Sequence, residues 1–161
     1  MTIEIGDKIP SATLKFIGAD GVTNVAVSEY FSNKKIVLFS VPGAFTPTCS
    51  AKHLPGFVEY TSDILGKGVD EIICISVNDP FVMNAWEKDQ NSKGKVTLLA
   101  DGNGEFTEAL GLSFDGSGFG LGKRGQRFAM IINNGVVSYL AIEEAGSFDV
   151  SSAESILKVL D

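Results

Sequence analysis

Cysteine and histidine are scarce in this 161-residue chain, which contains only Cys49, Cys74 and His53. Disulfides are rare in the reducing interior of cells, so two cysteines do not predict a structural disulfide. Two thiols and one imidazole are also too few for the four nitrogen or sulfur ligands of a typical structural zinc site. The sequence therefore predicts neither a metal site nor a bound organic cofactor, and we expect Cys49 to act as a free thiol.

Basic residues and long apolar runs are scarce as well. The chain has 13 lysine and arginine residues against 20 aspartate and glutamate residues, which gives a formal net charge of -7. This balance argues against a general binder of nucleic acid or of anionic membranes, because both need a basic surface. No apolar run approaches the roughly 20 residues of a membrane span. The N-terminal letters "MTIEIGDKIP" show neither a secretory nor a transit pattern, so we expect a cytoplasmic protein.

Short apolar strand patterns alternate with helical patterns along the chain, without internal repeats. The run "IVLFSV" at 36–41 is rich in β-branched residues and predicts a buried central strand, as does "EIICISV" at 71–77. In the first half of the chain we also expect two short strands around a turn at 19–21, a short turn capped by Ser28, and a helix over 46–65 bent at Pro55. Further on we expect a helix beginning after Asn78 or Asp79, a strand over 96–100, a helix over 104–111, an irregular glycine-rich loop over 111–125, a hairpin turning at 133–135 and a C-terminal helix capped by Ser151 or Ser152.

This order of elements predicts an α/β fold of the thioredoxin-like type, in which helices flank a mixed central sheet and a β-hairpin extends the N-terminus. Parallel pairing is expected in the strand–helix–strand section and antiparallel pairing in the last hairpin. Hydrophobic residues make up 44% of a chain that is long enough for one substantial core. We therefore expect residues 1–161 to form a single domain.

The segment "FSVPGAFTPTCS", residues 39–50, places Cys49 just after the expected central strand, in the first turn of the next helix. Chemistry in such folds gathers where strands end and helices begin. Free N–H groups and the helix dipole stabilise an anion in the first turn, so this position favours the thiolate. Thr46 can offer a hydroxyl, while Pro42 and Pro47 stiffen the loop. The alternative is that Cys49 is an inert buried side chain.

The longer segment "PGAFTPTCSAKHLPGF" resembles the active-site segment of the peroxiredoxins. Pro42, Thr46 and Cys49 match the proline, the threonine or serine and the cysteine of that family at the same spacing. The flanking letters resemble the type II, or peroxiredoxin-five, subfamily and are similar to the peroxiredoxin part of peroxiredoxin–glutaredoxin hybrids. Further matches, in the family's order and over most of the chain, are "SVNDPFVMNAW", "LLADGNGEFTEALGL" and "GLGKRGQRFAMIINNGVV".

The resemblance implies a thiol-dependent peroxidase that reduces hydrogen peroxide and alkyl hydroperoxides. Cys49 would be the peroxidatic cysteine, whose thiolate attacks the O–O bond and becomes a sulfenic acid. Thr46 would position the peroxide and hydrogen-bond the thiolate, and Pro42 would shield the sulfur from water. The family's essential arginine maps to Arg127, whose planar, permanently charged guanidinium suits a thiolate and a peroxide at once.

Three further residues bear on this assignment. Arg124 is the competing arginine, and we expect it to be a solvated surface charge. Gly125 stands where the family often has a serine, which would loosen the loop without removing the arginine. His53 follows Cys49 by four residues and would share its helix face, so a Cys–His pair for acyl transfer is an alternative. No third orienting group is evident for such a pair, and we interpret His53 as a structural or supporting residue.

Regeneration of Cys49 needs a second thiol. Cys74 lies inside an apolar strand and is expected to be structural, and the last part of the chain has no cysteine. The expected cycle therefore uses one cysteine, with glutathione plus glutaredoxin, or thioredoxin, as the reductant. The resemblance also implies a homodimer. The alternatives are a peroxide sensor or redox-relay protein that uses the same cysteine and, less favoured because there is no Cys-x-x-Cys, a thiol oxidoreductase.

Three other patterns predict structure and no cofactor. The glycines Gly120, Gly122 and Gly125 have the spacing of a dinucleotide fingerprint, but they precede an expected strand where the fingerprint must open a helix. "DGNGE", from Asp101, begins like a calcium loop but lacks the carboxylate at its twelfth position, so we expect a turn and a helix cap. Phe81, Met83 and Trp86 are expected to be packing residues of one helix.

Overall fold

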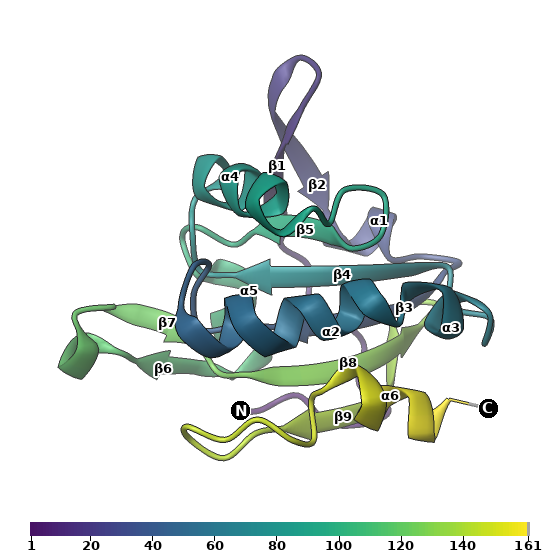
Figure 1. The fold of residues 1–161 in the computed structure, drawn as a ribbon. Helices are drawn as coiled ribbons and strands as arrows, with labels where there is room; N and C mark the ends of the chain where they lie inside the picture. Colours follow the sequence, from purple (N-terminus) through teal and green to yellow (C-terminus); the bar gives the residue numbers. More distant parts are fainter. Residues whose placement is uncertain (161) are drawn as a thin grey trace.

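The computed structural model of this chain describes residues 1–160 and has a seven-stranded mixed sheet at its centre (Figure 1). The strands lie in the order β2-β1-β5-β4-β3-β8-β9. Strand β4 pairs in parallel with both β3 and β5, and the other neighbours are antiparallel. The strands of this sheet are β1 Thr13–Gly18, β2 Gly21–Ala26, β3 Lys35–Ser40, β4 Glu71–Ser76, β5 Thr97–Ala100, β8 Phe128–Asn133 and β9 Val136–Ile142. This arrangement confirms the predicted α/β fold of the thioredoxin-like type and the N-terminal hairpin.

The sheet has a hydrophobic layer on each face, because alternate residues of a strand point to opposite sides. Val37 and Phe39 of β3 lie in the same buried cluster as Cys49, whereas Ile36 and Leu38 belong to the cluster on the other face. The first layer is covered by α2 (Leu54–Glu59), α3 (Thr61–Leu65), α4 (Pro80–Gln90) and α6 (Ala153–Val159), and the second by α1 (Val27–Tyr30) and α5 (Glu105–Leu110). No helix within residues 1–160 is long and apolar enough to cross a membrane.

Several predicted caps and turns are confirmed. The Asp79 carboxylate accepts the N–H of Val82 at 2.8 Å and caps α4, and Ser152 caps α6. Asp101 is buried and its carboxylate accepts the N–H of Thr107 at 2.8 Å, so the "DGNGE" turn is a helix cap. Asn134 and Gly135 both have positive φ, the conformation that a two-residue hairpin turn between β8 and β9 requires.

Two predictions about helices are wrong. Ser28 lies inside α1, whose N-cap is Ala26 without a side-chain hydrogen bond. The helix predicted over 46–65 is not continuous, because it is interrupted at Tyr60, between α2 and α3. Residues 47–59 are helical without interruption, so Pro55 lies inside a helical segment, directly after the π-helical turn Cys49–His53, which already departs from the regular i to i−4 hydrogen bonding.

The glycine-rich segment 111–125 is also more regular than predicted. It forms a second small sheet, in which β6 (Ser113–Asp115) pairs with β7 (Lys123–Gly125) around the 3-10 turn η2 (Ser117–Phe119). Gly120 and Gly122 adopt positive φ, so glycine makes the reversal possible while the short strands still pair. This hairpin projects from the main sheet (Figure 1), and its glycines do not open a helix.

Candidate active site

Cys49 lies where β3 meets the next helix, as the sequence predicts. The chain becomes helical at Pro47, and Cys49 begins a π-helical turn, η1 (Cys49–His53). The N–H of Leu54 bonds to the carbonyl of Cys49, five residues earlier, which is the wider π spacing. Cys49 and His53, four residues apart, are both fully buried in this turn. The turn therefore presents a thiol and an imidazole together beside β8.

Arg127, immediately before β8, contacts both of these side chains. Its Nη2 donates a hydrogen bond to Sγ of Cys49 at 3.1 Å, and its Nη1 donates to Nδ1 of His53 at 2.7 Å. The guanidinium fork thus spans the thiol and the imidazole, and its positive charge lies directly against the sulfur. This placement favours a thiolate and a developing negative charge on a nearby oxygen.

His53 is neutral in this site. Nε2 lies 2.9 Å from the carbonyl oxygen of Ser151, which can only accept, so Nε2 carries the hydrogen and Nδ1 is the bare acceptor for Arg127. Burial and the neighbouring Arg127 lower the pKa of His53 from 6.5 to about 3, against the opposing effects of the Ser151 carbonyl and Glu143. Both ring nitrogens are occupied, and no lone pair is left to take a proton from Cys49. The geometry therefore does not support the Cys–His acyl-transfer alternative.

The Ser151 segment is itself held by Glu143, which follows β9. Oε2 of Glu143 accepts hydrogen bonds from the N–H groups of Asp149 and Ser151 and from the hydroxyl of Ser151, at 2.6–2.8 Å. Burial acts to raise the pKa of Glu143, but these hydrogen bonds outweigh burial and lower that pKa. Phe148, in the same loop, packs on His53 with ring centroids 5.0 Å apart.

Thr46 and Pro42 lie in the loop before the helix, and neither makes a hydrogen bond to Sγ of Cys49 as Arg127 does. The hydroxyl of Thr46 donates to the carbonyl of Gly43 at 2.6 Å, and within residues 1–160 it makes no hydrogen bond to Cys49. The oxygen of Thr46 keeps its lone pairs, so it can accept a hydrogen bond from the O–H of a bound peroxide. Pro42 is half-buried and lines a cavity that opens beside Arg127.

Arg124 is not the solvated surface charge that the sequence predicts. It is half-buried, its Nε donates to the carbonyl of Leu121 at 3.0 Å, and its Nη1 donates to the carbonyl of Pro42 at 3.2 Å. Strand β7 places this guanidinium against the loop before Cys49, a contact between segments about 80 residues apart that sequence spacing does not reveal. Arg124 therefore braces the active-site loop.

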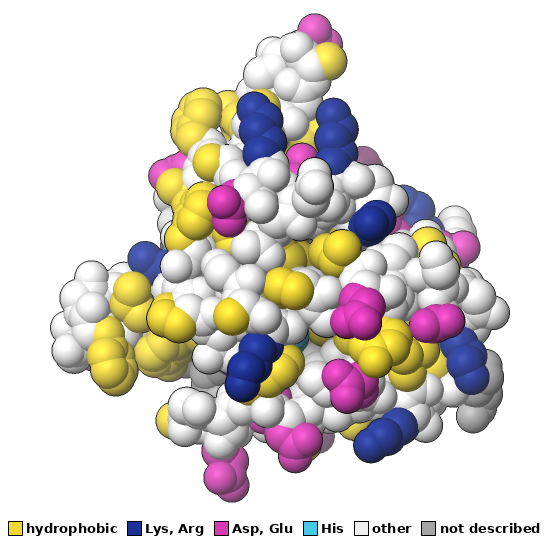
Figure 2. Space-filling view, in the orientation of Figure 1, with side chains coloured by type: hydrophobic (Ala, Val, Ile, Leu, Met, Phe, Trp, Pro, Cys, Tyr) yellow, Lys and Arg dark blue, Asp and Glu magenta, His cyan; other side chains and the backbone are white. Residues whose placement is uncertain are grey.

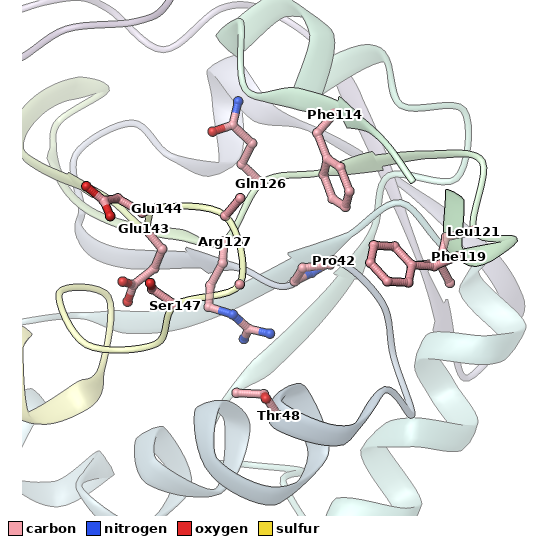
Figure 3. A pocket seen from close by; sticks show the side chains of 12 residues that line it. Pro42, Thr48, Phe114, Phe119, Leu121, Gln126, Arg127, Glu143, Glu144 and Ser147 are labelled. Atoms are coloured by element: carbon pink, nitrogen blue, oxygen red, sulfur yellow. The ribbon is translucent and has the colours of Figure 1, made fainter. Parts of the chain in front are cut away.

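A cavity of about 530 Å³ opens beside Arg127 (Figure 3). One wall is apolar and comes from Pro42 and the β6–β7 hairpin, with Phe114, Phe119 and Leu121. The opposite wall is polar and comes from the loop after β9. Cys49 is fully buried and does not line the cavity, whereas Arg127 both lines the cavity and donates a hydrogen bond to the sulfur.

Cys74, the second thiol, lies in the middle of β4 opposite Phe39 of β3 and is fully buried. Burial raises the pKa of the Cys74 thiol, with Cys49 adding to the rise and Arg127 opposing it. The two cysteines are not bonded to each other. This environment is that of an inert packing residue.

Gly125, where the family pattern often has a serine, is buried and faces Ser40 at the end of β3. A Cβ at Gly125 would lie 3.2 Å from Oγ of Ser40, and that Oγ has no hydrogen-bond partner within residues 1–160. Gly125 is itself a residue of β7 and pairs with Ser113, so it lies in a short strand and not in the irregular loop that the sequence predicts.

Sequence reasoning did not find the role of Glu143, Ser151 and Phe148. They follow β9, about 95 residues after the cysteine segment, and no motif marks them. The four-residue spacing of Cys49 and His53 was the one available signal, but it pointed to direct pairing of these two, whereas Arg127 lies between them. Within the described part of the chain, no group of three or more metal-binding side chains is close enough to hold an ion.

Comparison with known proteins places these features in a family. The Redoxin family matches residues 4–157. The chain is 50% identical to chloroplastic Peroxiredoxin-2E of Arabidopsis thaliana, over 99% of this chain and 70% of that protein. It is 46% identical to hybrid peroxiredoxin hyPrx5 of Haemophilus influenzae, over 96% of this chain and 65% of that protein. Reduced Prx3 of Vibrio vulnificus, solved in complex with H2O2, has a TM-score of 0.96 and 51% identity, over 99% of this chain and 100% of that one. The chain therefore belongs to the redoxin family, as a peroxiredoxin of the type II group, and is a thiol-dependent peroxidase.

Proposed function

We propose that Cys49 is the peroxidatic cysteine and that Arg127, Thr46 and Pro42 form the site around it. The observation that carries this proposal is the hydrogen bond of 3.1 Å from Nη2 of Arg127 to Sγ of Cys49, beside the main cavity. A permanently charged donor at this distance stabilises the attacking thiolate and, as the reaction proceeds, the leaving oxygen.

The chemistry is a two-electron transfer from sulfur to peroxide. A lone pair of the Cys49 thiolate forms an S–O bond with the terminal peroxide oxygen as the O–O bond breaks. The departing hydroxide or alkoxide takes up a proton and leaves as water or an alcohol, and Cys49 becomes a sulfenic acid. The hydroxyl oxygen of Thr46 accepts a hydrogen bond from the O–H of the peroxide, and Pro42 excludes water from the sulfur.

We propose hydrogen peroxide and alkyl hydroperoxides as substrates. The polar wall of the cavity and Arg127 suit the O–O–H group, while the apolar wall of Phe114, Phe119 and Leu121 suits an alkyl substituent. The Vibrio vulnificus relative was solved with H2O2, which supports the smaller substrate.

Cys49→Ser tests the assignment, and Cys74→Ser is the matched control. We expect Cys49→Ser to abolish peroxide consumption in a complete reducing system and Cys74→Ser to retain it. Arg127→Gln should lower the rate constant for oxidation of Cys49 by about 10²–10³-fold, the cost of removing one such donor. Consumption of peroxide by Cys49→Ser at the parental rate would refute the proposal.

We further propose that an external thiol, glutathione with glutaredoxin or thioredoxin, reduces oxidised Cys49. The environment of Cys74 supports this, because burial inside β4 raises the pKa of its thiol and so disfavours the thiolate that would have to attack oxidised Cys49. Turnover assays with each reductant separate the two systems. Fast oxidation with slow recycling by both would favour the peroxide-sensor alternative.

The homodimer and the cytoplasmic location also remain proposals. Exposed aromatic side chains support self-association: Phe45 is 52%, Phe81 66% and Phe119 85% exposed. The exposure of Phe81 contradicts its predicted packing role, whereas Met83 and Trp86 are buried as predicted. Figure 2 shows apolar side chains gathered over the β6–β7 hairpin, at the left of the view. Sedimentation velocity of the parent and of Phe119→Ser tests the dimer, and fractionation of source cells tests the location.

A further inference from the structure

A continuous series of hydrogen bonds runs from the reactive sulfur to a buried carboxylate 94 residues away along the chain. Its members, in order, are Cys49, Arg127, His53, Ser151 and Glu143. The first two members are assigned to catalysis above. Within residues 1–160, His53 and Ser151 make no hydrogen bond to the sulfur and do not line the cavity, so we expect their effect on the reaction to act through Arg127. Glu143 also lines the polar wall of the cavity, so its effect through Ser151 has to be separated from a direct one.

The direction of each hydrogen bond is set by the chemistry of its partners. Arg127 can only donate and the Ser151 carbonyl can only accept, so His53 fits between them only as the neutral tautomer with its hydrogen on Nε2. A protonated His53 would place an N–H against Nη1 of Arg127 at 2.7 Å and bring two cations together. The Ser151 carbonyl therefore selects the form of His53 that binds Arg127.

A neutral acceptor has a consequence for the charge of Arg127. Neither ion pair found within residues 1–160 includes this arginine. His53 orients the guanidinium but adds no negative charge, so the full positive charge remains available to the thiolate and to the leaving oxygen. A carboxylate in the place of His53 would orient Arg127 and would compensate its charge at the same time.

The loop that carries the Ser151 carbonyl is fixed from the other side. Glu143 accepts three hydrogen bonds from Asp149 and Ser151, and Phe148 packs on both His53 and Arg127, with Cζ of Arg127 5.8 Å from its ring centroid. The orientation of the Arg127 guanidinium thus depends on the loop between β9 and α6. Within residues 1–160, no residue of this loop hydrogen-bonds to the sulfur.

We propose that His53 is a positioning residue, which holds Arg127 in the orientation that peroxide reduction needs, and that Glu143 fixes His53 through Ser151. This inference rests on the proposed role of Arg127. It extends the site from the loop of Cys49 to the segment between β9 and α6.

Two substitutions at His53 separate its two hydrogen bonds. His53→Asn keeps an acceptor near the place of Nδ1 and loses the bond to Ser151. His53→Gln keeps a donor near the place of Nε2 and loses the bond to Arg127. If His53 positions Arg127, His53→Gln should be slower than His53→Asn; if it only anchors the loop, the order should reverse.

The measurement is the rate constant for oxidation of Cys49 by hydrogen peroxide in a single turnover, beside that for alkylation of the same thiol by uncharged iodoacetamide. We expect His53→Gln to slow oxidation by about 10²-fold, the cost of a misplaced catalytic group, and alkylation by less than tenfold. His53→Asn should slow oxidation by less than tenfold. A merely structural defect would slow both reactions equally, and thermal unfolding checks that each variant is folded.

Glu143→Gln tests the far end of the series, with Glu59→Gln on the exposed face of α2 as the matched control. We expect Glu143→Gln to slow oxidation by about tenfold through the weaker hold on Ser151. We expect Glu59→Gln to leave the rate unchanged. In the His53→Gln background, Glu143→Gln should have no further effect, because the connection is already broken.

The outcomes distinguish this inference from the function on which it rests. If Arg127→Gln is slow and His53→Gln matches the parent, the positioning role is refuted and the function stands. Equal losses in both rate constants for His53→Gln would also refute it. If Arg127→Gln itself reacts at the parental rate, the proposed function of Arg127 fails, and the inference fails with it.

Discussion

Arg124 and Pro42 are joined by a hydrogen bond of 3.2 Å, in which Nη1 of the arginine donates to the proline carbonyl. The bond passes over Gly43, where an added Cβ would lie 2.6 Å from the same Nη1. Gly43 is therefore needed for close approach of the guanidinium to the backbone and not for an unusual φ. This contact fixes the loop between β3 and Cys49 from outside the site.

Gly43→Ala is expected to displace the guanidinium of Arg124 and break its bond to Pro42. The displaced atoms are the far end of a flexible, half-buried side chain, so the free energy of unfolding should fall by only about 0.5–1.5 kcal/mol, and oxidation of Cys49 should slow because Pro42 is less well held. Urea unfolding and single-turnover kinetics measure the two effects. Arg124→Met should reproduce both, and a parental unfolding midpoint in the two variants would contradict this account.

Phe114→Ala is expected to change substrate preference, since the side chain forms part of the apolar wall of the cavity. The KM for cumene hydroperoxide should rise about tenfold, because a bulky apolar substituent loses contact area. The KM for hydrogen peroxide should stay the same. A parallel change for both peroxides would show that Phe114 acts on the site as a whole.

Cys74→Ala is expected to keep peroxidase activity with an external reductant and to lower the free energy of unfolding by about 1 kcal/mol through a small cavity. Intact mass spectrometry after one equivalent of peroxide should show a gain of one oxygen in the parent and in the variant alike. A loss of two hydrogens in the parent, absent from the variant, would make Cys74 the resolving cysteine.

Acid should destabilise the protein through His53. In the unfolded chain His53 takes up a proton near pH 6.5, whereas its folded pKa is about 3. The unfolded state therefore binds more protons between these pH values. The contribution of His53 to stability is complete above about pH 6.5 and is lost as the pH falls, by at most ~1.4 kcal/mol per pH unit.

Urea unfolding between about pH 4.5 and 6.5 measures this slope above the range in which most carboxylates titrate. The side chain introduced by His53→Asn does not titrate, and the other titrating groups are common to both proteins, so the stability of the variant should vary less with pH than that of the parent. Equal slopes would show that His53 is accessible to protons in the folded state.

Ser40→Ala is expected to stabilise the protein, because Oγ of Ser40 is buried and has no partner within residues 1–160. Removing an unsatisfied hydroxyl should raise the free energy of unfolding by about 1 kcal/mol. The control Ser62→Ala, on an exposed face of α3, should change it by less than about 0.5 kcal/mol. A destabilised Ser40→Ala would indicate that a bound water satisfies this hydroxyl.

Local patterns were sufficient for most of the secondary structure. The apolar run that contains Phe39 predicts a central strand, and Asp79 predicts a cap, because each depends on residues next to it. The predictions that were wrong concern features that neighbouring residues alone do not determine. Ser28 and the break at Tyr60 depend on how the helices pack, and pairing of Phe114 with Arg124 across the small sheet joins residues that no local pattern connects.

The sequence by itself determined the fold class and the place of Cys49 at the start of a helix, because the order of strands and helices depends on patterns of neighbouring residues. The resemblance to the peroxiredoxins predicted Arg127, but only the tertiary structure decided how Arg127 contacts the sulfur and which further groups support it. Arg127 and Glu143 come from segments far from Cys49, and side-chain hydrogen bonds a few ångströms long form only after the sheet has brought those segments together. The neutral form of His53 likewise exists because folding buries it between a donor and an acceptor.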